Sequence, residues 1–319
     1  MARNSIGKLY CIHSFGESHG PMVGSVAEGF PSNTLIDLNH IRYQMNRRRP
    51  GQSNLSTDRD ESDDFTLVSG IFEGKSTGAP ITFLIPNTDA QSKDYSHLKD
   101  IFRPGHADYT YQAKYKNRDY RGGGRSSARI TAGWVAAGAM AESYLKEQLG
   151  IEIIAYTQSV GALNCPPVNA ALSKEQVDAH AVRCPNAEAA EKMQRYIEQL
   201  KADGDSIGGT IRCIVKNIPA GLGEPVFGKF NALLAQYMMS INAVKSISVG
   251  DDQNLLKKGS ELSDKPGTEG FWNTKDNKNS GLLGGISTGE NIDFTLGFKA
   301  RSSIAKTQEA FDKDFNPIS

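Results

Sequence analysis

The chain has 319 residues, of which 38% are hydrophobic and 23% charged, and this composition describes a globular protein and excludes a disordered or membrane-embedded chain. Its 36 Lys and Arg residues balance 36 Asp and Glu residues, so no overall field favours nucleic acid or an anionic membrane surface. The sequence has neither an apolar run of transmembrane length nor an apolar signal region near its start, so we expect a cytoplasmic protein without membrane or nucleic-acid partners.

The N-terminal stretch is predicted to form two strands joined by a polar loop. Residues 6–12 have alternating apolar character, residues 13–20 are polar, and an apolar run resumes at 22–26. Ser18 and His19 lie in the loop, with a glycine on either side of the group. Imidazole is the side chain best suited to proton transfer near neutral pH, so His19 is a candidate acid or base; the alternative is a solvated loop histidine.

A predicted helix within residues 33–49 ends in three consecutive arginines, and Asp37 stands where it can cap the helix. Cations at a helix C-terminus interact favourably with the helix dipole, which accounts for one or two of these side chains. Arg47, Arg48 and Arg49 together must repel one another unless an anion or carboxylates gather them. An anion-binding role and a structural role are both open at this point.

A predicted hairpin is followed by a loop that carries a second histidine. Residues 65–72 and 80–85 are rich in β-forming residues, and residues 87–100 are polar with few apolar anchors, as in a surface loop. His106 then follows a Pro-Gly turn close to Arg103. A second loop histidine near basic residues strengthens the hypothesis that both histidines act in chemistry.

Positive charge is concentrated in residues 101–129, which contain seven basic and two acidic residues. Three consecutive glycines allow close approach of a ligand to the backbone, and Ser126 or Ser127 can cap a helix predicted over 130–149. A helix N-terminus favours anions, and arginines at 118, 121, 125 and 129 add charge and forked donors. We interpret this segment as an anion site; the alternative is a glycine-rich loop with solvated arginines.

The second half of the sequence alternates strand and helix patterns, which suits an α/β or α+β fold without choosing its topology. Strands are predicted over 151–160, 210–215 and 240–250, and helices over 173–200, with a break at Cys184-Pro185, and over 230–239. Glycines punctuate residues 281–304, and the residues after Ile304 have no clear period. No P-loop, dinucleotide-binding, serine-hydrolase or zinc-ligand pattern occurs, and the four cysteines lack metal-ligand spacing, so no metal site is predicted.

A series of motifs in a fixed order resembles the chorismate synthase family. The match is close over about the first 150 residues and continues to Ser303; its motifs are Phe15–Gly20, Arg47–Gly51, Phe102–Tyr109, Asp119–Arg129, Asp203–Gly208, Pro219–Pro225, Met239–Lys245 and Leu283–Ile286. Several long motifs together are far more specific than any one of them. The resemblance implies a single-domain α+β protein over residues 1–319, a βαβ sandwich with helices packed between antiparallel sheets, that assembles as a homotetramer.

The activity that the resemblance implies is a lyase reaction of the shikimate pathway of aromatic amino-acid biosynthesis. Phosphate is eliminated from 5-enolpyruvylshikimate 3-phosphate by a 1,4-anti elimination that gives chorismate. Members of the family are flavoproteins that require reduced FMN, and NADPH is a possible reductant of the flavin. His19 and His106 match the family's two proton donors, His19 for the departing phosphate and His106 near the reduced flavin.

The resemblance also assigns binding residues. The substrate carries a phosphate and two carboxylates, and the expected contacts are Arg48, Arg49 and Arg129. The flavin contacts are expected at Arg125, Ser126, Ser127, Asn242, Ala243, Gly284, Lys299, Ala300, Arg301, Ser302 and Ser303. Two departures stand out: Ala300-Arg301 replaces the Pro-Thr common in relatives, and Asn54 stands where some relatives have an arginine that contacts NADPH.

A third family signature, of the type Gly-Arg-His-Asp-Pro, is not reached before Ser319, so the sequence as printed is expected to lack that C-terminal segment. Either the protein continues beyond this point or the site lacks a part; we favour continuation, because removing a family-wide segment should uncover a core face. The alternative function is a noncatalytic flavin- or phosphosugar-binding protein that has lost the C-terminal part of the site. Nucleic-acid binding through the Arg-Gly-Gly-Gly-Arg loop is disfavoured by zero net charge and the absence of further such repeats.

Overall fold

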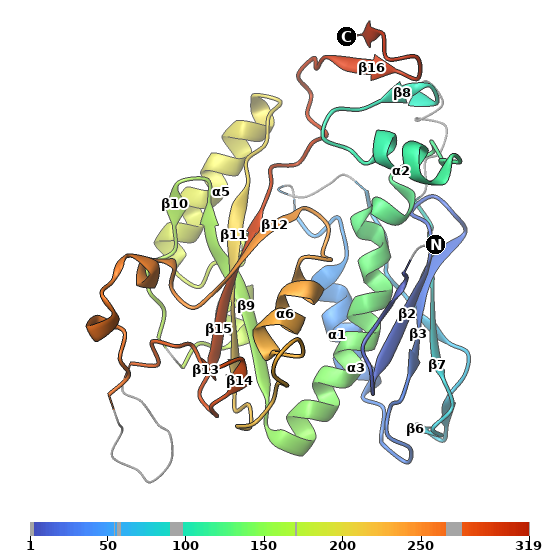
Figure 1. Ribbon diagram of the computed structural model, residues 1–319. Helices are drawn as coiled ribbons and strands as arrows, with labels where there is room; N and C mark the ends of the chain where they lie inside the picture. Colours follow the sequence, from blue (N-terminus) through green and yellow to red (C-terminus); the bar gives the residue numbers. More distant parts are fainter. Residues whose placement is uncertain are drawn as a thin grey trace. The chain divides into compact units, whose positions relative to one another are not determined.

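The computed structural model describes residues 3–53, 55, 59–89, 98–169, 171–265 and 276–318 (Figure 1). Contacts within the chain define two compact units. Unit 1 comprises Met1–Ser143 and Ala305–Ser319, and unit 2 comprises Tyr144–Ile304. Each contains an antiparallel five-stranded sheet with helices, which agrees with the predicted α+β class.

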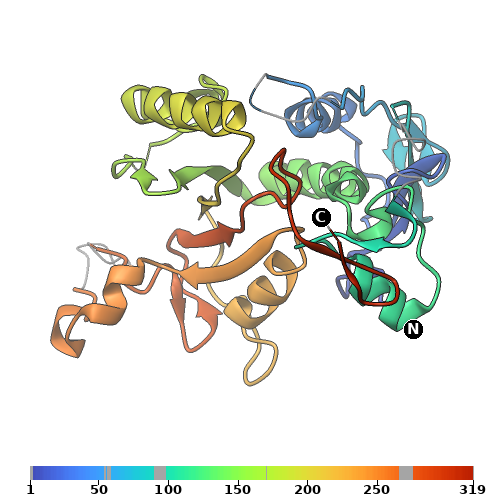
Figure 2. The same ribbon diagram turned by 90° about the horizontal axis from the view of Figure 1, so that it is seen from above.

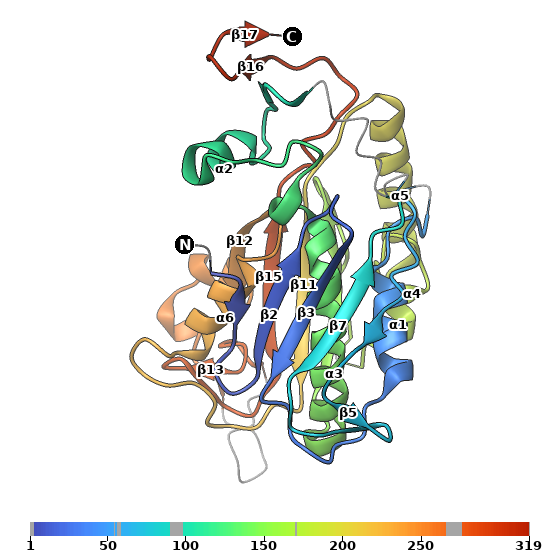
Figure 3. The same cartoon turned by 90° about the vertical axis from the view of Figure 1, so that its right-hand side faces the viewer.

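The sheet of unit 1 has the strand order β1-β2-β3-β7-β4 (Figure 3). These strands are β1 (Ser5–Ile6), β2 (Cys11–Gly16), β3 (Met22–Glu28), β7 (Ile81–Pro86) and β4 (Thr66–Leu67). The prediction of one strand over 6–12 was wrong, because Gly7, with φ 101°, turns the chain so tightly that a Cβ there would lie 1.9 Å from the Tyr10 carbonyl oxygen. The longer strand therefore begins at Cys11 and ends directly before the His19 turn.

Helix α1 (Leu38–Arg48) is capped by Asp37, whose carboxylate accepts from the His40 N–H at 2.9 Å, as predicted. Helix α3 (Thr131–Leu149) confirms the helix predicted over 130–149, and its first part packs closely on β3. A Cβ on Gly133 would lie 2.6 Å from the Gly24 backbone, so only glycine allows this approach. The Ser25 hydroxyl donates to the Gly133 carbonyl at 2.7 Å and fixes the contact.

Several shorter strands and a helix also belong to unit 1. The antiparallel pairing of β4 with β7 confirms the hairpin predicted from residues 65–72 and 80–85, and β5 (Ile71–Phe72) and β6 (Lys75–Ser76) form a small hairpin between them. Helix α2 (Asp108–Tyr115) follows strand β8 (Ile101–Phe102). Near the C-terminus, β16 (Ala310–Asp312) pairs with both β8 and β17 (Pro317–Ile318), as Figure 1 shows for β8 and β16. No period was visible there in the sequence, because these strands are only two or three residues long.

The sheet of unit 2 has the order β10-β9-β11-β15-β12. Its strands are β9 (Glu152–Val160), β10 (Leu163–Asn164), β11 (Gly209–Lys216), β12 (Val244–Val249) and β15 (Ile292–Phe298). Helices α4 (Lys174–Asp178), α5 (Ala187–Ala202) and α6 (Phe230–Met238), the hairpin β13 (Leu282–Leu283) and β14 (Ile286–Ser287), and the short turns η4 (Asp252–Leu256) and η5 (Gly259–Glu261) surround it. The predicted capping box of Ser173 and Gln176 is confirmed at the start of α4.

Two apolar clusters cover the opposite faces of this sheet because side chains alternate along each strand. Tyr156 and Met193 belong to the cluster beneath α5, whereas Phe294 and Phe230 belong to the cluster beneath α6. Figure 2 shows α5 and α6 on the two sides of the sheet. Among the residues that the structure describes, none of the helices combines the length and the apolar character needed to cross a membrane.

Candidate active site

The His19 turn joins β2 to β3 and lies against the glycine-rich segment. The Ser18 side chain is buried, and its hydroxyl oxygen lies 2.9 Å from His19 Nδ1 and accepts from the Gly124 N–H at 3.1 Å. A Cβ on Gly122 would lie 2.1 Å from His19 Nδ1, so the imidazole rests on a backbone without a side chain. The structure therefore brings together two segments that the sequence analysis had singled out separately.

The surroundings of His19 favour an anion. Burial lowers the pKa of His19 below its ordinary value of 6.5, and the positive charges of Arg59, Arg121 and Arg103 lower it further, whereas Asp119 opposes them. The neutral imidazole is thus stabilised while the site holds no anion. A bound anion would reverse the charge effect and promote protonation of the ring.

A cluster of buried charges lies next to this turn. Asp63, with a side chain 0% exposed, pairs with both Arg48 and Arg129. Glu61, 1% exposed, pairs with Arg59 and accepts from the Thr88 N–H at 2.9 Å and hydroxyl at 2.8 Å. Burial alone would raise the pKa of Glu61, but the Thr88 and Arg59 hydrogen bonds outweigh it and lower the pKa to about 2.

The three adjacent arginines of α1 have different surroundings. Arg48 joins the buried cluster, which confirms that a carboxylate gathers one of the three charges. Arg47 donates to the Gln44 amide oxygen at 2.9 Å and stacks over the Tyr43 ring, and Arg49 is exposed. The carboxylate partner was not predicted from the sequence; the available signal was the cluster of four acidic residues within positions 60–64, beside Arg59.

Arg129 is almost entirely buried, with a side chain 2% exposed. Its Nε donates to Asn87 Oδ1 at 2.7 Å, and NH2 donates to the Pro86 carbonyl at 2.9 Å. The Asn87 amide nitrogen donates in turn to the carbonyls of Glu17 at 3.0 Å and Gly20 at 2.8 Å. Arg129 is therefore linked to both ends of the His19 turn through one side chain.

The start of α3 is organised by Arg125, Ser126 and Ser127. Arg125 is half-buried and donates to the carbonyls of Gly16 at 2.9 Å and Ser14 at 3.1 Å. Ser126 donates to the Gly123 carbonyl at 2.6 Å, and Ser127 accepts from the Arg129 N–H at 3.2 Å. Ser127 thus has the predicted capping role, on a short 3-10 turn that leads into α3.

His106 lies on the loop between β8 and α2. Its Nδ1 is 2.8 Å from the Pro104 carbonyl oxygen, which can only accept a hydrogen bond, so Nδ1 carries a proton. The loop is anchored by Asp108, which accepts from the Arg103 backbone N–H at 3.1 Å and from its Nε at 2.8 Å and pairs with Arg118 at 3.0 Å. Asp108 was not singled out from the sequence, because its partners are known only after folding.

The remaining expected flavin contacts lie in unit 2. Asn242 and Ala243 directly precede β12, and residues 299–303 directly follow β15. The Ala243 carbonyl accepts from the Lys299 N–H at 3.0 Å, so the two groups of residues are neighbours. Gly284 lies in the β13–β14 turn with φ 61° and open space where a Cβ would be.

The polar groups of residues 299–303 form a small set of donors. The Lys299 ammonium donates to the Ser302 hydroxyl. The segment is tied to the rest of unit 2 by the Ser206 hydroxyl, which donates to the Arg301 carbonyl at 2.7 Å. A cation with neighbouring hydroxyls is a donor set that suits a phosphate group, so the residues present here fit the flavin phosphate.

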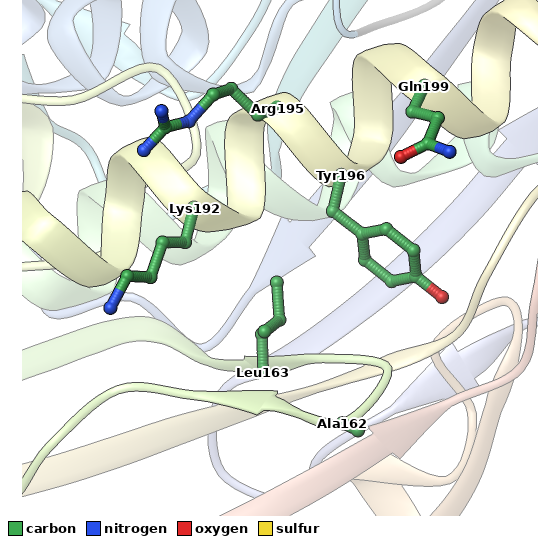
Figure 4. A pocket seen from close by; sticks show the side chains of 6 residues that line it. All are labelled: Ala162, Leu163, Lys192, Arg195, Tyr196 and Gln199. Atoms are coloured by element: carbon green, nitrogen blue, oxygen red, sulfur yellow. The ribbon is translucent and has the colours of Figure 1, made fainter.

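A surface pocket of about 400 Å³ lies elsewhere in unit 2, between α5 and β10 (Figure 4). It is lined by Ala162, Leu163, Lys192, Arg195, Tyr196 and Gln199. Its two cations are each paired on α5, Lys192 with Glu188 and Arg195 with Glu191. None of the expected site residues lines this pocket. Asn54, where the sequence analysis weighed a contact with NADPH, lies outside the described residues.

Comparison with known proteins identifies the family. The family model described as chorismate synthase matches residues 10–318. The chain belongs to the chorismate synthase family. The chorismate synthase of Flavobacterium psychrophilum is 47% identical over 310 residues, which cover 97% of this chain and 86% of that protein. The enzyme of Phocaeicola vulgatus is 48% identical over 307 residues, which cover 96% of this chain and 86% of that protein.

A solved structure also agrees. A crystal structure of a chorismate synthase superimposes with a TM-score of 0.77 at 28% identity, covering 93% of this chain and 86% of that one. The predicted family, its α+β fold and its enzyme class, a carbon–oxygen lyase, are thereby confirmed.

Proposed function

We propose that this protein eliminates phosphate from 5-enolpyruvylshikimate 3-phosphate to give chorismate, by a 1,4-anti elimination in the shikimate pathway. The observation that best supports this activity is the position of His19, a half-buried imidazole on the glycine-rich segment with Arg59, Arg121 and Arg103 acting on it. A leaving phosphate needs both positive surroundings and a proton donor. This turn offers both.

His19 acts as the acid for the departing phosphate. Ser18 Oγ lies 2.9 Å from His19 Nδ1 and accepts from the Gly124 N–H. We assign the tautomer in which the Ser18 hydroxyl donates to Nδ1, and the proton of the neutral ring is then on Nε2. The negative charge of the substrate then raises the pKa of the ring, and the imidazolium is formed where the phosphate leaves.

The arginines hold the substrate anions. Arg48 and Arg49 at the end of α1, with Arg129 in the buried cluster beside them, are the proposed substrate residues. Arg48 is 16% exposed, Arg129 is 2% exposed, and both pair with Asp63. A multiply anionic substrate requires concentrated positive charge in a protein whose net charge is zero.

Reduced FMN is the proposed cofactor. When bound, it supplies electron density as the phosphate leaves and assists removal of the C6 hydrogen. The proposed flavin-binding residues are Arg125, Ser126, Ser127, Asn242, Ala243, Gly284 and residues 299–303. His106 is the second proton donor, acting through Nε2 because Nδ1 is engaged by the Pro104 carbonyl.

Anaerobic turnover with chemically reduced FMN tests this function. Phosphate release from 5-enolpyruvylshikimate 3-phosphate is followed for the wild type, His19→Ala and His106→Ala. We expect the wild type to be active and each variant to lose about 100-fold or more of its rate while still binding FMN. A wild type that binds FMN and substrate without releasing phosphate would instead be a noncatalytic binding protein.

Three further features of the proposal follow from the family resemblance: a single chorismate synthase-like domain over residues 1–319, a homotetramer, and NADPH as a source of electrons. A cytoplasmic location is proposed from the sequence itself. Reduction of FMN by NADPH in the purified protein, without an added reductase, tests the source of electrons. Light scattering of the purified protein tests the tetramer.

A further inference from the structure

The carboxylate of Asp63 is buried between two arginines. Its Oδ2 accepts from NH1 of Arg48, and its Oδ1 accepts from NH1 of Arg129, so each oxygen holds a different guanidinium. The Asp63 side chain is 0% exposed. An ion in such a place is costly unless it is paired and hydrogen-bonded, and here both conditions are met.

The two arginines lie in different surroundings. The Arg129 side chain is 2% exposed and Arg48 is 16% exposed, so only Arg48 reaches solvent appreciably. Burial lowers the pKa of Arg48, Asp63 counteracts this effect, and the like charge of Arg129 adds to it. Without the carboxylate, two guanidinium groups would face each other unscreened. Asp63 is therefore what allows Arg48 to stay in its observed position.

The other oxygen of the carboxylate connects to the His19 turn. Arg129 donates to Asn87, and the Asn87 amide holds the carbonyls of Glu17 and Gly20. These two carbonyls belong to the residues that flank Ser18-His19. One carboxylate thus links the outer arginine to the turn that carries the imidazole.

We propose that Asp63 is a positioning residue of the substrate site, which fixes the guanidinium of Arg48 relative to the His19 turn. This inference rests on the proposed function, because Arg48 and His19 are proposed substrate and proton-transfer residues. Asp63 itself does not contact the substrate. It acts by holding one guanidinium with each oxygen.

The direction in which substrate affinity changes when Asp63 is replaced distinguishes a positioning role from a purely electrostatic one. Replacing Asp63 by Asn removes a negative charge, and by charge alone the site would bind an anionic substrate more tightly. Loss of positioning predicts weaker binding, because the amide presents a donor to one of the two guanidinium groups. The backbone of Asp63 has φ 55°, a left-handed conformation that Asn also adopts readily. Asp63→Asn therefore changes the charge with little change in backbone preference.

The experiment measures binding of 5-enolpyruvylshikimate 3-phosphate by calorimetry, without flavin so that no turnover occurs. The proteins are the wild type, Asp63→Asn, Asp63→Glu and, as a matched control, Asp64→Asn, which changes an exposed neighbour. We expect Kd to rise about tenfold in Asp63→Asn and less in Asp63→Glu, which keeps the charge, and to stay unchanged in Asp64→Asn. Thermal unfolding of each protein establishes that the folded states are compared.

An unchanged or lower Kd in folded Asp63→Asn would overturn the inference. If Asp63→Asn does not fold, the test rests on Asp63→Glu. An unchanged Kd in that variant would also overturn the inference. Phosphate release by the wild type with reduced FMN tests the proposed function separately, so substrate binding without turnover would refute the function and leave the binding comparison intact. A wild type that binds no substrate, either alone or with FMN present, would refute both.

Discussion

The imidazole of His19 lies directly against the backbone of Gly122. A Cβ atom at position 122 would stand 2.1 Å from His19 Nδ1 and 2.2 Å from Cε1, far inside ordinary contact distance. The φ angle of Gly122 is not positive, so glycine is required here for space rather than for backbone conformation. The middle of the glycine-rich segment is therefore shaped to the histidine.

Replacing Gly122 by Ala should displace the His19 ring. Because proton transfer depends on position to within about 1 Å, we expect phosphate release to fall roughly 100-fold. Gly138→Ala is the matched control, since a Cβ there meets nothing within 4 Å, and it should leave the rate unchanged. Steady-state phosphate release with reduced FMN measures both. Equal rates for Gly122→Ala and the wild type would contradict the proposed role of the ring position.

The pKa of His19 gives a second prediction. Burial and then Arg59 lower it below 6.5 in the protein without substrate. We expect NMR titration to find a midpoint below 6.5 that rises on addition of inorganic phosphate, because a nearby anion stabilises the imidazolium. The double variant Arg59→Gln, Glu61→Gln removes the positive charge of Arg59, which lowers the pKa of His19, together with the carboxylate that pairs with it. The titration midpoint of His19 should therefore rise in this variant as well. A midpoint above 6.5 in the protein without phosphate would contradict the burial argument.

Much of the site was visible in the sequence, because its residues occupy contiguous motifs. Glycines beside Ser18-His19 and at 122–124 indicated turns, and a cap at Ser126 or Ser127 followed from their place before an apolar helix; the structure shows that it is Ser127. What the sequence did not show is that these two turns contact each other. A contact between residues 18 and 124 depends on how α3 packs on β3, which local patterns do not specify.

The carboxylates that hold the arginines were missed for a related reason. Arg48 and Arg129 are brought together by Asp63, whose separation from them in sequence gives no periodic signal. The strands β16 and β17 were missed because two or three residues cannot establish an alternating pattern. Long periodic elements such as α1 and α3 were predicted to within a few residues.

A third prediction concerns stability and the loop that carries His106, which Asp108 anchors. Asp108 accepts from the Arg103 backbone and guanidinium and pairs with Arg118, and it is 4% exposed. Burial alone would raise the pKa of Asp108, but the hydrogen bonds and charge of Arg103 outweigh it and lower the pKa, so the carboxylate stays charged at neutral pH. Removing one partner of a buried pair leaves an uncompensated charge, so Asp108→Asn should lower the free energy of unfolding by about 3 kcal/mol.

The control for Asp108→Asn is Asp178→Asn, whose partner Arg183 lies 3.8 Å away in a more exposed pair. That change should cost no more than about 1 kcal/mol. Urea unfolding measures both variants, and phosphate release per folded molecule reports on the His106 loop. Similar losses in the two variants would contradict the view that Asp108 anchors the loop.

Glu61 gives a fourth prediction, for stability in acid. Its pKa in the folded protein is about 2, against an ordinary value of 4.5. Because the folded-state pKa is the lower one, the stabilisation is complete above pH 4.5 and is lost as the pH falls towards 2. A shift of this size corresponds to roughly 3 kcal/mol. In Glu61→Gln the free energy of unfolding should therefore be lower at pH 7 and depend less steeply on pH over this range.

Urea unfolding at several pH values measures the pH dependence of Glu61→Gln against that of the wild type. Glu147→Gln, at an exposed position of α3, is the control and should keep the wild-type slope, because the Glu147 side chain is not buried by folding. If Glu61→Gln also kept that slope, the hydrogen bonds from Thr88 and Arg59 would not be stabilising the charged carboxylate.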